Sequence, residues 1–362
     1  MRRLRVGVVG VGHLGKEHAR ILAGLPEVEL VGVADSHAPQ AEAVAARCGT
    51  RAFTDHRELL PLVEAAVVAV PTAWHHAVAA DFLSRGVPLL VEKPLASTLE
   101  QAEELVALAG RNNALLQVGH IERFNPAFEE LRRRPLQAKY VTCERYGGFS
   151  GRSTDIGVVL DLMIHDLDLV LALVQAPVLT VEALGAAVLG GHEDLAQARL
   201  TFAGGCVADL TASRAHPAPV RRMQVWSPEG FAGVDFARRR LTLVQPAEHL
   251  RQGRLDSRRL DAATLGSLKG ELFGRHLQTL ELDCDTRDQL TCELEEFVRC
   301  VRTGQRPRVD GAAGRDALAV ASRVLDGLRA HRWDGEAGGP AGPHQLPAPR
   351  GSLFAPPRRE AA

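Results

Sequence analysis

The sequence predicts an α/β protein, in which a doubly wound parallel sheet is followed by a second domain with a mostly antiparallel sheet packed on a few helices. Three observations predict this fold class. Apolar runs alternate with helical patterns as far as residue 121, strand-like segments then follow one another in hairpin order, and helical patterns return between 288 and 328. Strands separated by helices imply a parallel sheet, whereas strands in hairpin order imply an antiparallel one.

Length and composition indicate a globular protein of two domains. A chain of 362 residues is long for one hydrophobic core. Its 46% hydrophobic and 24% charged residues are typical of proteins that fold in water. Because 43 Lys and Arg nearly balance 44 Asp and Glu, no overall charge favours nucleic acid or an anionic membrane as a partner. We expect a small neutral or anionic ligand instead.

Cysteine usage and hydropathy favour the cytoplasm. The six cysteines form no CxxC pair and no tight Cys/His cluster, so we expect neither a metal site nor a disulfide framework. The apolar run at the start is short, broken by glycine and lacks the pattern of a cleaved signal peptide. No apolar segment approaches the roughly 20 residues of a membrane-spanning helix.

The first strand and the turn after it carry a dinucleotide-binding fingerprint. Residues 4–9 read LRVGVV, a short apolar run, and GVGHLG follows, leading into a helical spacing of apolar residues. Strand, glycine turn and helix thus occur in the order that the fingerprint needs. We expect Gly10 to permit the turn, Gly12 to let the backbone approach a pyrophosphate and Gly15 to let the helix pack on the strand. The amino end of the helix offers N–H groups to the phosphates.

The second strand ends in a carboxylate suited to a ribose. VELVGVAD ends at Asp35, twenty residues after Gly15, where a carboxylate can accept hydrogen bonds from adenosine ribose hydroxyls. The alternative interpretation is an aspartate that caps a turn or helix. No arginine follows immediately, which favours NAD over NADP, although Arg47 and Arg51 leave NADP open.

The remaining strands of the first sheet, within EAAVVAVPT, VPLLVEKP and ALLQVGH, also end in polar or proline residues. Ligands of a doubly wound sheet lie beyond the carboxyl ends of its strands. Lys93 is either a solvated loop charge or a functional cation, and Pro94 favours the second by restricting the backbone of Lys93 to extended conformations. The residues at these strand ends are Pro71, Thr72, Lys93, Pro94 and His120.

A polar stripe interrupts an otherwise apolar helix in the second domain. The segment 161–170 reads DLMIHDLDLV, and helical spacing puts Asp161, His165 and Asp168 on one stripe beside an apolar one. An unpaired carboxylate is costly to bury. The stripe should therefore face a partner, a cavity or a ligand.

We divide the chain into three parts by composition and by the pattern of expected strands and helices. Residues 1–121 form the nucleotide-binding domain and residues 122–333 form the second domain, whose strands lie in segments such as KYVTCERY and QARLTFAGGCVADLTASR. Residues 334–362 are rich in Pro, Gly and Ala and bury little apolar surface, so we expect this tail to be disordered.

Taken together, GVGHLG, Asp35, the EKP of residues 92–94, and the D-x-x-x-H of Asp161 and His165 resemble the Gfo/Idh/MocA oxidoreductase family. The resemblance covers about residues 4–333. It implies a Rossmann domain followed by a domain whose large, mostly antiparallel open sheet commonly joins subunits into a homodimer or homotetramer. Family members mostly transfer hydride between a sugar or cyclitol carbon and a bound nicotinamide.

The resemblance also implies site residues. His165 would be the base, its neighbour Asp161 would help to orient or bind the reacting hydroxyl, and Lys93 would stabilise the developing alkoxide. Which of Lys93 and His165 takes the proton is left open, and for Asp168 we favour a supporting hydrogen bond or ion pair. Thr72 stands where many members have asparagine after the proline. The further expected cofactor contacts are His13, Leu14, Pro71, Thr72, His75, Glu92, Lys93 and Arg123, and the further expected substrate contacts are Lys93, Asn125 and Arg152.

A closer resemblance, carried by VGHIERFNPAF and VVLDLMIHDLDLVLAL, is to the subgroup of UDP-N-acetylglucosamine 3-dehydrogenases. If it holds, Arg145, Arg152 or Arg214 meets the substrate diphosphate, since guanidinium pairs well with phosphate oxygens. One alternative is a free-sugar or inositol dehydrogenase without a diphosphate site. The other is a non-catalytic nucleotide-sensing protein, which would need neither Lys93 nor His165.

Overall fold

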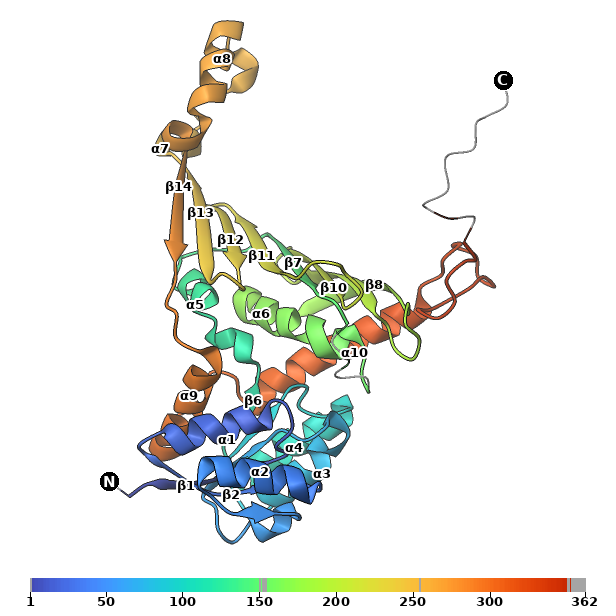
Figure 1. Cartoon of the computed structure of the whole chain (residues 1–362). Coiled ribbons are helices and arrows are strands. Elements are labelled where there is room, and N and C mark those ends of the chain that lie inside the picture. The colour runs from blue at the N-terminus through green and yellow to red at the C-terminus, as the bar shows by residue number, and fades with distance from the viewer. Residues whose placement is uncertain (1, 150, 152–154, 254, 350–351, 353–362) are drawn as a thin grey trace.

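The computed structural model describes residues 2–149, 151, 155–253, 255–349 and 352 (Figure 1). It contains a six-stranded sheet in the order β3-β2-β1-β4-β5-β6 and an eight-stranded sheet in the order β14-β13-β12-β11-β7-β10-β9-β8. The first is parallel throughout, and the second is antiparallel except where β10 pairs with β7. The predicted fold class is confirmed.

The first sheet forms because its central strands are apolar on both faces. Every residue of β4 and β5 is buried, which is typical of parallel strands covered by helices on both sides. The strand order reverses between β1 and β4, the point at which doubly wound sheets bind ligands. The elements are β1 (Leu4–Val9), α1 (Gly15–Gly24), β2 (Val28–Ala34), α2 (Ala38–Cys48), β3 (Ala52–Phe53), η1 (His56–Glu58), β4 (Ala65–Val68), α3 (Thr72–Leu83), β5 (Leu89–Glu92), α4 (Leu99–Arg111) and β6 (Leu116–Gly119).

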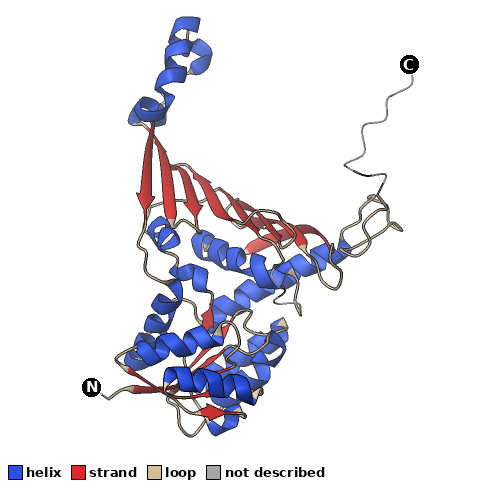
Figure 2. Cartoon of the chain, viewed as in Figure 1, coloured by secondary structure: helices blue, strands red, loops and turns tan. Residues whose placement is uncertain are grey.

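The second sheet is covered by helices on one face only (Figure 2). Burial alternates along β9 and β10, so one face packs on helices and the other stays open. The crossover contains η2 (Ile121–Phe124) and α5 (Pro126–Arg132), and the covering helices include η3 (Val159–Met163) and α6 (Ile164–Val174). The strands are β7 (Tyr140–Tyr146), β8 (Val178–Ala186), β9 (Leu195–Phe202), β10 (Val207–Ser213), β11 (Val220–Ser227), β12 (Gly230–Asp235), β13 (Arg240–Pro246) and β14 (Leu277–Asp283).

The last two helices tie the sheets together. In α9 (Gln289–Thr303), Leu294 and Phe297 belong to the apolar core around β1, although the helix follows the second sheet in the chain. Val118 N then donates to Val309 O at 2.9 Å, before α10 (Gly311–Ala330) runs along the second sheet (Figure 1). The proposed boundary at residue 121 thus separates the two sheets, while α9 packs with the first.

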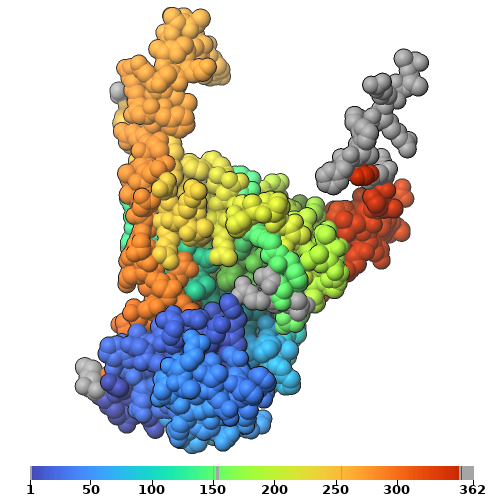
Figure 3. Space-filling view, in the orientation of Figure 1, coloured from blue at the N-terminus to red at the C-terminus, as the bar shows by residue number. Residues whose placement is uncertain are grey.

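An arm of residues 247–276 joins β13 to β14 and stands away from the body of the protein (Figure 3). None of its described residues is buried, and Phe273 is 66% exposed. The arm contains α7 (Glu248–Arg251), η4 (Ser257–Arg259), α8 (Ala262–Glu271) and η5 (Leu272–His276).

We expect the tail to be disordered, but backbone oxygens near its start accept hydrogen bonds from the second domain. Trp333 Nε1 donates to Gly342 O at 2.9 Å, and Ala187 N donates to Pro343 O at 2.8 Å. Residues 350, 351 and 353–362 of this tail lie outside the described part of the chain. Across the described residues, no helix combines the length and apolar character needed to span a bilayer, and no three His, Cys, Asp or Glu side chains are grouped to hold a metal ion.

Candidate active site

A cleft of about 1330 Å³ lies between the carboxyl ends of the first sheet and the helix-covered face of the second. One wall consists of the glycine turn after β1 and the ends of β2, β4 and β5. The other consists of the end of β7, the segment before η3, and the residues of η3 and α6 that include Asp161 and His165. The cleft is large enough for a dinucleotide together with a second small molecule.

The glycine turn shows why glycine stands at each of its positions. Gly10 has a φ of +80°, and a Cβ there would lie 2.6 Å from Val70 N. A Cβ on Gly15 would lie 1.8 Å from Gly10 O, so α1 packs against the turn only with glycine at that position. A Cβ on Gly12 would meet nothing within 4 Å, because Gly12 borders the open cleft. The turn therefore leaves room for a phosphate group beside the amino end of α1, which no side chain caps.

Asp35 holds this turn to the end of β2. Its Oδ2 accepts from Val11 N and its Oδ1 accepts from His37 N, each at 2.9 Å. The carboxylate also lines the cleft, so the turn-capping role and a ribose-binding role are compatible. Arg51 points elsewhere, since its Nε donates to Val31 O at 3.3 Å. Neither Arg47 nor Arg51 is among the described residues that line the cleft. Arg57 does line it, with its Nε donating to Asp81 Oδ2 at 3.2 Å.

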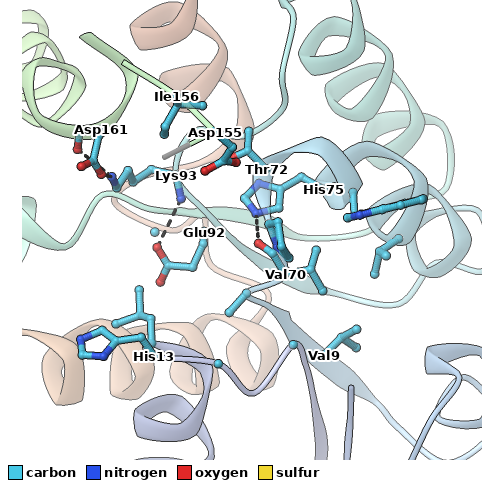
Figure 4. Close-up of a pocket in the computed structure, with 18 of the residues that line it drawn as sticks. Val9, His13, Val70, Thr72, His75, Glu92, Lys93, Asp155, Ile156 and Asp161 are labelled. Atoms are coloured by element: carbon cyan, nitrogen blue, oxygen red, sulfur yellow. Dashed lines mark hydrogen bonds and ion pairs between the residues drawn. The ribbon is translucent and has the colours of Figure 1, made fainter. Parts of the chain in front are cut away.

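Lys93 and Asp161 meet across the cleft from different domains. Lys93 Nζ donates to Asp161 Oδ1 at 3.0 Å and to Asp161 O at 2.7 Å, as Figure 4 shows. The Lys93 side chain is only 15% exposed, so its charge is held in place rather than solvated. Glu92 supports the same loop, with its Oε2 accepting from Lys93 N at 3.3 Å and its Oε1 lying 2.7 Å from His18 Nε2.

His165 borders the cleft beside this pair as a neutral imidazole. Its Nδ1 is buried and has no hydrogen-bond partner, so Nε2 is the ring nitrogen left to meet a ligand. Burial, followed by the charges of Lys93 and Arg145, holds the pKa of His165 well below its usual range. An imidazole that is neutral at physiological pH can accept a proton.

The helix that carries the polar stripe begins differently from the α-helix predicted. Residues 159–163 form a π-helical turn, and α6 starts at Ile164. Such turns are frequent at functional sites. Asp161 and His165 both line the cleft, but Asp168 does not, because it is buried and paired with Arg123.

Arg123 and Asn125, expected to touch cofactor or substrate, are not among the described residues that line the cleft. Arg123 is buried and makes two bonds to Asp168, of 2.6 and 3.0 Å, because a buried carboxylate needs a cation. Asn125 is fully buried: its Oδ1 accepts from Ala127 N at the start of α5, and its Nδ2 donates to Phe236 O at 3.2 Å. Both side chains hold the crossover between the domains.

The arginines expected at a diphosphate are also engaged. Arg145 is buried between Glu122 and Asp166, at 2.7 Å from each. Arg214 Nε donates to Asp194 Oδ1 at 2.6 Å. Arg152 lies outside the described residues.

The expected cofactor contacts on α3 and on the glycine turn do line the cleft. His75 bridges two loops, with Nδ1 2.8 Å from Pro94 O and Nε2 2.9 Å from Val70 O. Burial lowers the pKa of His75. The others are His13, Leu14, Pro71 and Thr72.

The family is decided by sequence comparison. Residues 4–120 match the model of an oxidoreductase family with an NAD-binding Rossmann fold, and residues 131–232 match the Gfo/Idh/MocA C-terminal domain. A UDP-N-acetylglucosamine 3-dehydrogenase of Acidithiobacillus ferrooxidans is 37% identical over 325 residues, which are 90% of this chain and 97% of that protein. The chain belongs to the Gfo/Idh/MocA family.

A more distant relative and a solved structure agree with this assignment. The scyllo-inositol 2-dehydrogenase (NAD⁺) of Bacillus subtilis is 27% identical over 329 residues, covering 85% of this chain and 89% of its own. A solved structure of the Acidithiobacillus ferrooxidans enzyme has a TM-score of 0.80 at 35% identity, covering 90% of this chain and 98% of that one. The protein is thus an NAD-binding oxidoreductase, related to sugar and cyclitol dehydrogenases.

Sequence reasoning missed one residue that lines the cleft and one buried neighbour of His165. His120, which the sequence places only at the end of a strand, is buried, and neither of its ring nitrogens has a hydrogen-bond partner. Its ring lies edge-on to that of His165, with 6.3 Å between the ring centroids. Arg221 on β11 lines the cleft. Strand alternation separates Arg221 from Arg222 only once the register is known, which explains why the sequence did not single it out.

Proposed function

We propose that the protein oxidises carbon 3 of a UDP-N-acetylhexosamine with NAD. The observation that carries this proposal is the meeting of Lys93, Asp161 and His165 at the cleft, beside a glycine turn shaped for a dinucleotide. The substrate is inferred from the relative that is 37% identical over 90% of the chain. A free sugar or an inositol is the alternative substrate, supported by the more distant inositol dehydrogenase.

The residues of the first domain fit NAD. Open space at Gly12 admits a pyrophosphate, and Asp35 lies where a ribose would be bound. We assign the nicotinamide end to the loops that carry Glu92 and Lys93. The full proposed set for the cofactor is Gly10, Gly12, His13, Leu14, Gly15, Asp35, Pro71, Thr72, His75, Glu92 and Lys93.

Alcohol oxidation requires removal of the hydroxyl proton while hydride leaves the same carbon. Bound NAD supplies the hydride acceptor. We assign the proton to Nε2 of His165, since that ring is neutral and borders the cleft. Lys93, fixed by Asp161, places an ammonium where the oxygen becomes negative, and Asp161 orients the lysine and the hydroxyl. Lys93 as the base is the alternative.

The proposal is tested by following reduced nicotinamide with UDP-N-acetylglucosamine, N-acetylglucosamine and inositol, with NAD and with NADP. An added 2-oxo acid and a direct check for keto-sugar guard against a cofactor that stays bound after one turnover. Oxidation of the UDP-sugar alone supports the proposal. Oxidation of only the free polyols would discard the nucleotide sugar, and nicotinamide binding without any turnover would favour the non-catalytic sensor.

We further propose that the protein works as a homodimer or homotetramer in the cytoplasm. The open face of the second sheet carries a row of three aromatic rings. The ring centroid of Trp226 lies 5.2 Å from that of Tyr140 and 5.2 Å from that of Phe231. Trp226 is 37% exposed, and such an apolar patch is typical of a subunit contact. Cell fractionation would test the location.

A further inference from the structure

Three arginines of the second domain line the cleft, and two of them are neutralised. Arg145 is buried between Glu122 and Asp166, and Arg214 is buried against Asp194. A buried cation with such partners is committed to holding the fold. Neither guanidinium is free to bind an anionic ligand without giving up a carboxylate.

Arg221, the third, is exposed and lines the same cleft. Among the described residues its side chain has no hydrogen-bond or ion-pair partner. It stands directly opposite Arg145 in the antiparallel pair of β11 and β7, so the two side chains share the sheet face that carries α6. Next to it, Arg222 points to the opposite face and pairs with Glu144.

The position of Arg221 suits the substrate rather than the cofactor. Arg221 belongs to the second sheet, whereas the glycine turn that faces a pyrophosphate belongs to the first. Its charge also acts at the reacting end of the cleft. Burial is the main cause of the lowered pKa of His165, and Arg221 is one of the cations that lower it further. A guanidinium presents paired N–H donors that match two phosphate oxygens.

We propose that Arg221 binds the diphosphate of the nucleotide-sugar substrate and thereby makes the enzyme select phosphorylated sugars over free ones. This inference rests on the proposed function. The competing role is a structural one, in which Arg221 offsets the second carboxylate of the Glu122, Arg145 and Asp166 cluster. Removal of the charge would then weaken the fold and affect all substrates alike.

The test compares Arg221→Gln with Arg222→Gln, which removes the same charge from the opposite face of the same strand. We expect Arg221→Gln to raise the KM for UDP-N-acetylglucosamine by about 10- to 100-fold, the loss of one charge-assisted contact, with kcat changed less than about 3-fold. Any slow turnover of N-acetylglucosamine should stay unchanged, because that sugar carries no diphosphate. Arg221→Lys should restore part of the affinity, because it returns the charge without the paired donors.

Binding of UDP to the NAD-loaded protein, followed by calorimetry, separates this inference from the proposed function because it needs no turnover. A Kd for UDP that rises in Arg221→Gln and not in Arg222→Gln supports the anion site, even if no UDP-sugar is oxidised and the proposed function fails. An unchanged Kd in Arg221→Gln overturns the inference. A fall in melting temperature with an equal loss for free and phosphorylated sugars also overturns it, in favour of the structural role.

Discussion

At the scale of single residues, the cleft brings an ammonium, a carboxylate and a neutral imidazole together. Lys93 arrives from the first sheet, and Asp161 with His165 arrives from the second domain. The lysine needs its partner, because an unpaired ammonium that is 15% exposed would be costly to desolvate. The imidazole needs no partner at Nδ1 to stay neutral, since burial and the neighbouring cations already favour the uncharged form.

This arrangement predicts an unusual acid limit for activity. The pKa of His165 is lowered well below its ordinary 6.5, so the base stays unprotonated as the pH falls through that value. We expect kcat/KM to stay level through pH 6.5 and to decline only in more acidic solution. Initial rates of nicotinamide reduction across pH measure this limit.

His165→Asn then identifies the base. We expect its rate to fall by about 10²- to 10⁴-fold and the acid limit to disappear with the imidazole. An acid limit that persists in the variant would assign the proton to Lys93 instead. His76→Asn is the control, because His76 pairs with Glu104 away from the described cleft residues.

Single residues also show what sequence could and could not reveal. The chemistry-bearing types, Lys93 and His165, follow from local motifs and do lie at the cleft. The role of each arginine does not follow from local motifs, because its partners are distant in the chain. Arg145 pairs with Glu122 and Asp166, both more than 20 residues away. A cation that binds a ligand and one that holds the fold look alike until the partners are known.

At the scale of elements, local sequence signals predict the glycine turn but not the π-helical turn. The glycine turn was predictable because strand, turn and helix adjoin in the sequence. The π-helical turn before α6 was not, because a spacing of four residues between Asp161 and His165 fits an α-helix equally well.

The glycine turn yields a prediction that separates folding from binding. Gly12→Ala meets no atom within 4 Å, so we expect stability to change by less than about 0.5 kcal/mol. Its methyl group fills the space proposed for the pyrophosphate, and the Kd for NAD should rise by roughly tenfold or more. Calorimetric titration with NAD measures this. Gly24→Ala, also open but outside the described cleft lining, should bind NAD normally, and wild-type affinity in Gly12→Ala would move the pyrophosphate away from the turn.

Helix α9 carries a second prediction, about stability and pH. Glu293 is fully buried, and neither carboxylate oxygen has a partner. Burial, then the charges of Glu92 and Glu296, raises its pKa well above the ordinary 4.5. The unfolded chain therefore releases this proton at lower pH than the folded one, and wild-type stability falls as the pH rises from 4.5 toward the folded pKa.

Glu293→Gln replaces the titrating carboxyl group with an amide that stays neutral at every pH. We expect it to stabilise the protein by about 1 kcal/mol at neutral pH, with the gain shrinking as the pH falls toward 4.5. Urea unfolding at several pH values measures the difference. Glu295→Gln, on the exposed face of the same helix, is the control and should show no such trend. A Glu293→Gln gain that is independent of pH would contradict the assignment of a buried acid.

At the scale of the whole molecule, the second sheet has an uncovered face and an unsupported arm. Apolar alternation predicted the strands, but residues 247–276 carry no such pattern, so their projection from the body of the protein could not be predicted (Figure 3). Helix α8 has ten residues, none of them buried. Isolated helices shorter than about 12–15 residues are marginal in water, so this one needs a partner surface.

We expect the arm to pack on a second copy of the chain. Pro246 pairs with Leu277, so replacing residues 247–276 by Asn-Gly closes β13 and β14 as a tight hairpin. The variant should bind NAD with unchanged affinity, because the arm lies apart from the described cleft residues, but its mass in sedimentation should fall to that of a smaller assembly. Equal masses for wild type and variant would show that the arm contributes nothing to assembly, and would leave the aromatic row on the open sheet face as the proposed contact between subunits.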